Sequence, residues 1–245
     1  MSELFLRTEL TFGKENMKKL AASRVIVFGI GGVGSYVVEA LVRSGLGAID
    51  IVDKDTVAVS NINRQLYALN STVGKNKVDV AEERIHDINP ECKVTKYKTF
   101  FLPETAAEFD FSKYDYIVDC IDTVKGKIEI VMKANEAKKP VISCMGAGNK
   151  IDPTKFQVSD IYKTSVCPLA RVMRNELKKR GIKKLKCLFS TEPVTPPKIP
   201  EELRGSEEFS NATKPVPGSN AFTPSVAGLI IAGEVIKDLT GMNKK

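Results

Sequence analysis

The chain has 245 residues, a length that suits one large α/β domain with a sizeable core. Its contents of 42% hydrophobic and 27% charged residues are ordinary for a globular protein. It contains no run of about 18 apolar residues, so no transmembrane helix and no membrane partner are expected. Charged residues among the first apolar ones argue against a signal peptide, and we expect a cytoplasmic protein.

The formal net charge of +7 suits a polyanionic partner without proving one. The cysteines are five in number and scattered, with no C-x-x-C pair, which argues for reduced thiols and against a zinc site. Cys120 and Cys144 end apolar segments, and we expect both to behave as small buried hydrophobic residues.

Strands and helices alternate through the first two thirds of the chain. Their predicted ranges are a helix at 16–23, a strand at 25–28, a helix from the glycine-rich turn to about 44, a strand at 48–55, a helix at 74–89, strands at 92–100 and 114–122, a helix at 124–138 and a strand at 140–148. This alternation predicts an α/β fold with a Rossmann-like, doubly wound, mostly parallel sheet.

The pattern changes after about residue 160. The remaining sequence predicts a helix over 167–181, a strand over 183–190, a long loop over 191–219 that is a candidate for disorder, and a last helix over 223–241. In that last helix, Thr223 is the expected cap, Pro224 the first residue and Gly241 the stop. We therefore expect residues 1–160 to form the main domain and 161–245 a C-terminal helix-strand-loop-helix extension packed on it.

A glycine-rich turn follows the first predicted strand. Gly29, Gly31 and Gly34 fit the pattern G-x-G-x-x-G, with Gly32 as an additional glycine. Such a turn lets backbone N–H groups approach a phosphate at a helix N-terminus. Asp53 lies nineteen residues after Gly34, about where a ribose-binding carboxylate belongs. These features predict a nucleotide site but do not distinguish NAD from ATP.

Two cations downstream favour a triphosphate. Arg64 and Lys77 would over-neutralise a dinucleotide pyrophosphate, whereas they suit ATP that is attacked at its α-phosphate. Asp122 is expected at the carboxyl edge of the sheet, where it is a candidate Mg²⁺ ligand. Each residue taken singly has an ordinary alternative, a solvated surface charge for either cation and a helix N-cap for Asp122.

Four segments together resemble the adenylating domain of the ubiquitin-activating-enzyme superfamily: GIGGVGS, DKDTVAVSNINRQ, GKNKVD and DCIDT. The resemblance implies that Gly31, Gly32 and Gly34 cradle phosphates, that Asp53 holds the ribose and that Asp122 binds Mg²⁺. It also implies that five further residues surround the nucleotide and its triphosphate: Asp55, Asn61, Arg64, Gln65 and Lys77. The segment LFLRTEL matches as well, and it implies a homodimer in which Arg7 reaches into the partner's active site.

The second half of the chain narrows the resemblance. CPLARVMR and FSTEP are similar to the tRNA threonylcarbamoyladenosine dehydratases of this superfamily. That branch adenylates the carboxylate of threonylcarbamoyladenosine in tRNA and closes it into a ring. The absence of two C-x-x-C pairs departs from the relatives that activate sulfur carriers and argues against a sulfur-carrier protein as partner.

Residues 171–186, which overlap the segment CPLARVMR, form a basic stripe in which Glu176 is the one acidic residue. It is the footprint expected for a phosphate backbone, although a solvated helix face is the ordinary alternative. The candidate tRNA-binding residues are Arg171, Arg174, Lys178, Lys179, Arg180, Lys183 and Lys184.

Two other functions stay open from the sequence. Adenylation of a ubiquitin-like sulfur carrier predicts pyrophosphate exchange that depends on a protein ending in Gly-Gly. A dinucleotide-binding oxidoreductase or sensor predicts tight NAD binding that is indifferent to Arg64→Ala. Whether a monovalent cation joins ATP and Mg²⁺ is also open.

Overall fold

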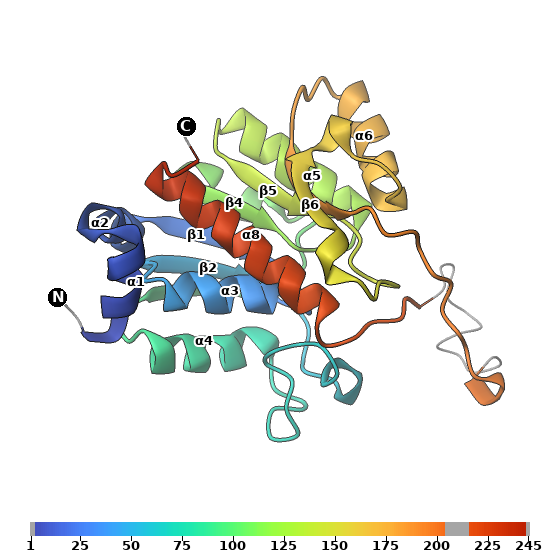
Figure 1. Cartoon of the computed structure of the whole chain (residues 1–245), viewed down its shortest axis with the longest axis horizontal. Coiled ribbons are helices and arrows are strands. Elements are labelled where there is room, and N and C mark those ends of the chain that lie inside the picture. Colours follow the sequence, from blue (N-terminus) through green and yellow to red (C-terminus); the bar gives the residue numbers. More distant parts are fainter. Residues whose placement is uncertain (1–2, 204–215, 244–245) are drawn as a thin grey trace.

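A seven-stranded sheet forms the centre of the computed structural model, which describes residues 3–203 and 216–243. The strand order is β3-β2-β1-β4-β5-β7-β6, and only β6 runs antiparallel to its neighbour. The strands are β1 (Arg24–Phe28), β2 (Ala48–Val52), β3 (Lys93–Tyr97), β4 (Tyr116–Asp119), β5 (Val141–Cys144), β6 (Phe156–Asp160) and β7 (Lys186–Ser190). The predicted Rossmann-like, mostly parallel α/β fold is confirmed (Figure 1).

Helices cover both faces of this sheet. They are α1 (Leu6–Phe12), α2 (Lys14–Ala22), α3 (Gly34–Arg43), α4 (Lys77–Ile88), α5 (Val124–Glu136), α6 (Pro168–Lys179) and α8 (Thr223–Thr240). Val25 and Val27 of β1 pack in one core with α3, α4 and α8, whereas Ile26 and Phe28 pack in another with α5. Burial on both faces explains why β1 is a continuous apolar run. No helix in the described part of the chain has the length and apolar character needed to cross a bilayer.

Two elements were not predicted from the sequence. Helix α1 has no buried residue, so it lacks the apolar stripe that would reveal it. Strand β6 is at the edge of the sheet and mostly half-buried, so its apolar character is weak. The predicted long loop contains no regular strand or α-helix within 191–203 and 216–222, whereas residues 204–215, on which much of the expected disorder falls, lie outside the described residues.

The start of α8 differs in detail from the prediction. Thr223 is the first helical residue rather than the cap, and its hydroxyl donates to the carbonyl of Lys150 at 3.1 Å. The side-chain oxygen of Asn220 instead accepts from the N–H of Thr223 at 2.8 Å. Gly241 ends the helix with φ = 80°, as predicted.

Two glycines of α8 allow a matched test of its packing. A Cβ on Gly228 would lie 2.4 Å from the carbonyl oxygen of Val33, whereas a Cβ on Gly233 would meet nothing within 4 Å. We expect Gly228→Ala to lower the free energy of unfolding by about 1–3 kcal/mol because it forces α8 away from α3. Gly233→Ala should raise it by about 0.5–1 kcal/mol through helix propensity. Urea unfolding of both variants measures the difference, and equal effects would contradict this packing.

Candidate functional site

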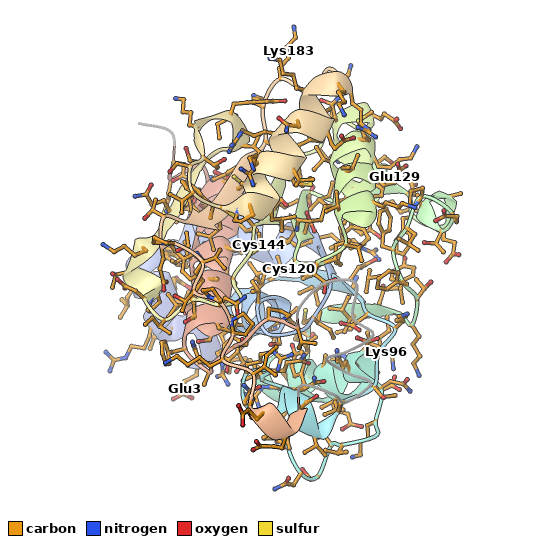
Figure 2. All side chains as sticks on the ribbon, turned by 90° about the vertical axis from the view of Figure 1, so that its right-hand side faces the viewer. Glu3, Lys96, Cys120, Glu129, Cys144 and Lys183 are labelled. Carbon is orange, nitrogen blue, oxygen red and sulfur yellow. The ribbon has the colours of Figure 1, made fainter. Side chains whose placement is uncertain are left out.

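A cavity of about 570 Å³ opens at the carboxyl ends of β1, β2 and β4, where the glycine-rich turn enters α3. Figure 2 looks toward this edge, and the labelled Cys120, which lines the cavity, lies near the middle of the view. The cavity brings together most of the predicted nucleotide residues: Gly29, Gly31, Gly32, Asp53, Asp55, Asn61, Arg64, Gln65, Lys77 and Asp122. The joint placement expected from the sequence is therefore present in the structure.

The glycine-rich turn packs too tightly for other side chains. Gly29 has φ = 80°, and a Cβ on Gly34 would lie 1.8 Å from the carbonyl oxygen of Gly29. Gly34 does not line the cavity. It lets the first turn of α3 close against the end of β1, which directs the helix N-terminus toward the cavity. Backbone N–H groups and the helix dipole at such an end favour an anion.

Asp53 is fixed as a hydrogen-bond acceptor. Its carboxylate accepts from the N–H groups of Ile30 at 3.1 Å and Asp55 at 2.9 Å, and the Lys77 ammonium lies 3.9 Å away. Burial raises the pKa of Asp53, and the nearby Lys77 opposes that rise. The carboxylate is thus held in one orientation, which suits it to accept hydrogen bonds from ribose hydroxyls.

The raised pKa of Asp53 predicts a pH-dependent effect on stability. The folded chain holds this proton more tightly than the unfolded chain, so stability falls as the pH rises above the ordinary value of 3.8. At pH 7, Asp53→Asn should therefore raise the midpoint of thermal unfolding while it weakens ATP binding. Below the ordinary pKa the wild-type carboxyl is protonated too, and the two midpoints should converge. An equal difference at every pH would contradict this origin.

The two cations of the cavity are held by internal partners. Lys77 is 5% exposed, and its ammonium lies 3.1 Å from a carboxylate oxygen of Asp55. The Arg64 guanidinium donates to the carbonyl of Ser60 at 2.8 Å and to the side chain of Asn63 at 2.9 Å. The Asp55 side chain is 55% exposed, so an anionic ligand can compete with it for Lys77. Both cations line the cavity together with Gly31 and Gly32 of the glycine-rich turn.

Asp122 is exposed in the loop between β4 and α5. The residue at the N-cap of α5 is Thr123, and no side chain caps this helix, so the alternative role of Asp122 as N-cap is wrong. Within 3–203 and 216–243 no group of three or more His, Cys, Asp or Glu residues could hold a metal. One exposed carboxylate nevertheless fits Mg²⁺, because this ion commonly binds one or two carboxylates together with phosphates and waters.

Part of the cavity wall was not predicted. The ammonium of Lys54 lies 4.5 Å from the ring centroid of Phe100, and both residues line the cavity. Residues 147–148 and 217–219 complete the wall. Residues 147–148 could have been inferred from their place at the carboxyl end of the fifth predicted strand. The second segment could not, because it arrives from far along the chain and is held by paired hydrogen bonds between Gly218 and Asn149 at 2.6 and 2.8 Å.

Arg7 lies away from the cavity of its own chain. Its helix, α1, follows Phe5, which packs 3.7 Å from the Cβ position of Gly45, just beyond the C-terminal end of α3. The cavity is at the opposite, N-terminal end of α3. Figure 1 shows α1 at the left end of the molecule and the segment leading into α8 at the right.

The residues of the predicted basic stripe fall into two groups, one with partners among the described residues and one without. Arg174 donates to the carbonyl of Thr164 at 2.9 Å, and Lys179 and Arg180 pair with Glu176 at 2.8 and 2.7 Å. The rest of the stripe is exposed and makes no side-chain hydrogen bond or ion pair within the described ranges. We call these residues the free basic set: Arg171, Lys178, Lys183 and Lys184.

The cysteines near the cavity are poor candidates for a nucleophile. Cys144 is 5% exposed, as expected. Cys120 is only half-buried, and it forms part of the cavity wall. Burial raises the pKa of the Cys120 thiol well above its ordinary value and those of Cys144 and Cys187 to about 12. These thiols stay protonated at neutral pH, and a thiol is a much weaker nucleophile than a thiolate.

The sheet and its carboxyl-edge cavity define a nucleotide-binding α/β protein. The chain belongs to the ThiF family, whose model matches residues 6–245. It is 49% identical over 244 residues to the tRNA threonylcarbamoyladenosine dehydratase of Bacillus subtilis, covering 98% of this chain and 95% of that protein. The resemblance to these dehydratases is confirmed.

Solved structures of the Escherichia coli tRNA N6-threonylcarbamoyladenosine dehydratase, TcdA, are also similar. In complex with AMP it superposes with a TM-score of 0.87 at 34% identity, covering 98% of this chain and 95% of that one. In complex with ATP the TM-score is 0.86 at the same identity and coverage. The similarity therefore extends through the C-terminal extension as well as the nucleotide-binding part.

Proposed function

We propose that this protein is an ATP-dependent dehydratase of threonylcarbamoyladenosine in tRNA. The observation that carries the proposal is the convergence of Asp53, Arg64 and Lys77 on one cavity at the carboxyl edge of the sheet. Relatives that cover nearly the whole chain bear this name, and one of them is known in complex with ATP. The ring closure needs no cysteine nucleophile, which agrees with the raised pKa of the Cys120 thiol on the cavity wall.

The reaction proceeds in two steps. The substrate carboxylate attacks the α-phosphorus of ATP, the bond to the β-phosphate oxygen breaks, and pyrophosphate leaves. The neighbouring carbamoyl group then attacks the activated carbonyl, AMP leaves with the carboxylate oxygen, and one proton is released. Because nucleophile and electrophile belong to the same side chain, the effective molarity of this step can reach about 10⁵ M.

The cavity residues have separate roles in this proposal. The N–H groups at Gly31 and Gly32 receive phosphate oxygens, and Asp53 accepts from the ribose. Arg64 and Lys77 stabilise the charge that develops on the departing pyrophosphate. Asn61 and Gln65, which line the cavity beside them, would contact the nucleotide. Asp122 would hold Mg²⁺, which neutralises phosphate charge when bound.

We propose that residues 1–160 form the adenylation domain and 161–245 the part that faces tRNA. The N-terminus of α6 lies close to the cavity, because the Cys167 sulfur is 4.0 Å from the Cβ position of Gly146, just before the wall residues 147–148. The free basic set therefore extends outward from the neighbourhood of the cavity. A substrate carried on tRNA supports a cytoplasmic location.

We also propose a homodimer with shared sites. The distance between α1 and the cavity within one chain leaves Arg7 free to act on a second copy. Arg7→Ala and Lys77→Ala variants should each be inactive alone, and their mixture should regain activity through heterodimers that contain one intact site. No recovery after verified subunit exchange would contradict sharing.

Mass spectrometry of nucleosides from tRNA tests the proposed activity. Wild-type protein with ATP should convert threonylcarbamoyladenosine into a product lighter by one water, and omission of ATP should abolish the change. Unchanged nucleosides under conditions where the protein binds ATP would overturn the proposal. Pyrophosphate exchange that needs a protein ending in Gly-Gly, with no response to tRNA, would instead indicate a sulfur-carrier substrate.

A further inference from the structure

A buried ion pair lies behind the cavity. Lys127 of α5 and Asp119 at the end of β4 are both 0% exposed, and their charged atoms are 3.0 Å apart. Neither residue lines the cavity. Replacing such a pair with apolar residues of similar volume is often neutral or stabilising, so its presence is weak evidence for a role in stability alone.

The pair holds one residue of the cavity wall by both of its backbone polar groups. The Lys127 ammonium donates to the carbonyl of Ile121 at 2.9 Å, and Asp119 accepts from the N–H of Ile121 at 3.3 Å. The hydroxyl of Ser143 donates to the other oxygen of Asp119 at 2.5 Å. A network with this many contacts restricts the pair, and therefore Ile121, to one position.

Ile121 lies between Cys120 and Asp122, and all three line the cavity. The loop they form receives little support from the helix that follows. Thr123 makes no capping bond to α5, and its buried hydroxyl has no partner within the described chain. The loop that carries Asp122 is therefore fixed on its β4 side, by the bond from the Cys120 N–H to the carbonyl of Phe28 at 2.8 Å and by the two side-chain bonds to Ile121.

We propose that Lys127 is a positioning residue that holds the Asp122 carboxylate in place for Mg²⁺ bound to ATP. The ammonium acts through the carbonyl of Ile121 and does not touch nucleotide or metal. This inference rests on the role of Asp122 in the proposed function. Partners that orient metal ligands are commonly worth 10–100-fold in metal affinity.

The test compares variants that separate positioning from folding. Lys127→Met alone leaves Asp119 buried without a counter-charge, so we expect it to unfold at lower temperature. Lys127→Met/Asp119→Asn removes both charges and should recover much of the lost thermal stability. The hydrogen bond from residue 127 to the carbonyl of Ile121 stays broken in this variant. Lys133→Met is the matched control, because Lys133 is on the same helix and pairs with exposed Glu136 at 2.9 Å.

Calorimetric titration of each variant with ATP, with and without Mg²⁺, gives a readout that needs no turnover. For the double variant, the Mg²⁺ concentration that half-saturates the enhancement of ATP binding should rise by about tenfold or more. ATP binding without Mg²⁺ should match wild type, and Lys133→Met should match wild type in both titrations. Ser143→Ala, which removes one hydrogen bond from Asp119, should shift the Mg²⁺ requirement less but in the same direction.

A double-mutant comparison identifies Asp122 as the residue affected. In an Asp122→Asn background, adding Lys127→Met/Asp119→Asn should cause no further change in the Mg²⁺ requirement. The inference is overturned if Asp122→Asn itself leaves that requirement unchanged, if the effects of the two changes simply add, or if folded Ser143→Ala and double variants retain the wild-type requirement. Failure of tRNA dehydration alongside the expected titrations would reject the proposed function and leave this inference standing.

Discussion

Lys77→Ala is expected to lower the rate of adenylate formation by about 10²–10³-fold, the usual loss when one preorganised charge-stabilising group is removed. The Lys77 ammonium is buried and lies between Asp53 and Asp55, at 3.9 and 3.1 Å. It therefore needs little reorganisation when charge develops on the departing pyrophosphate. Single-turnover formation of AMP from ATP in the presence of tRNA measures the loss.

The control for this variant is Lys75→Ala. Lys75 is exposed, lies two residues earlier and does not line the cavity. It should retain the wild-type rate. Because Lys77→Ala also leaves Asp53 without its cation, thermal unfolding should accompany the kinetics. A folded Lys77→Ala protein within threefold of the wild-type rate would contradict the role assigned to this residue.

Removal of the free basic set is expected to weaken tRNA binding by about 10²-fold at moderate salt, because each cation that contacts a phosphate releases a counterion. The change replaces four residues with alanine: Arg171, Lys178, Lys183 and Lys184. The plot of log affinity against log salt concentration should become shallower by about 3 units. Filter binding across a salt series measures both quantities.

A second quadruple variant controls for net charge. It replaces exposed lysines elsewhere on the surface, namely Lys14, Lys18, Lys93 and Lys113. It should keep most of the affinity and most of the salt slope. Equal losses in the two variants would show that tRNA responds to overall charge, and would contradict a tRNA surface on α6. Arg174→Ala tests folding instead, because Arg174 is bound to Thr164.

Local patterns in the sequence were sufficient to predict the six parallel strands of the sheet and most of the nucleotide residues that line the cavity. Short apolar runs such as Val25–Phe28 are typical of strands buried on both faces, and helices between them indicate parallel order. Gly29 and Gly34 are needed where backbone approaches backbone, so their spacing between a predicted strand and a predicted helix identifies the turn. The carboxyl ends of parallel strands meet at one edge, which is why Asp53 and Asp122 could be assigned to one site.

Contacts between segments that are distant in the sequence could not be predicted, because they depend on the tertiary structure. Strand β6 and residues 217–219 are held by partners far along the chain, and such contacts leave no periodic signal in the local sequence. The same holds for the basic stripe, where Arg174 turns inward to Thr164 and its neighbours stay exposed. It holds most strongly for Lys127 and Asp119. Charged residues usually lie at the surface, and their burial against Ile121 follows from the packing of α5 on β4.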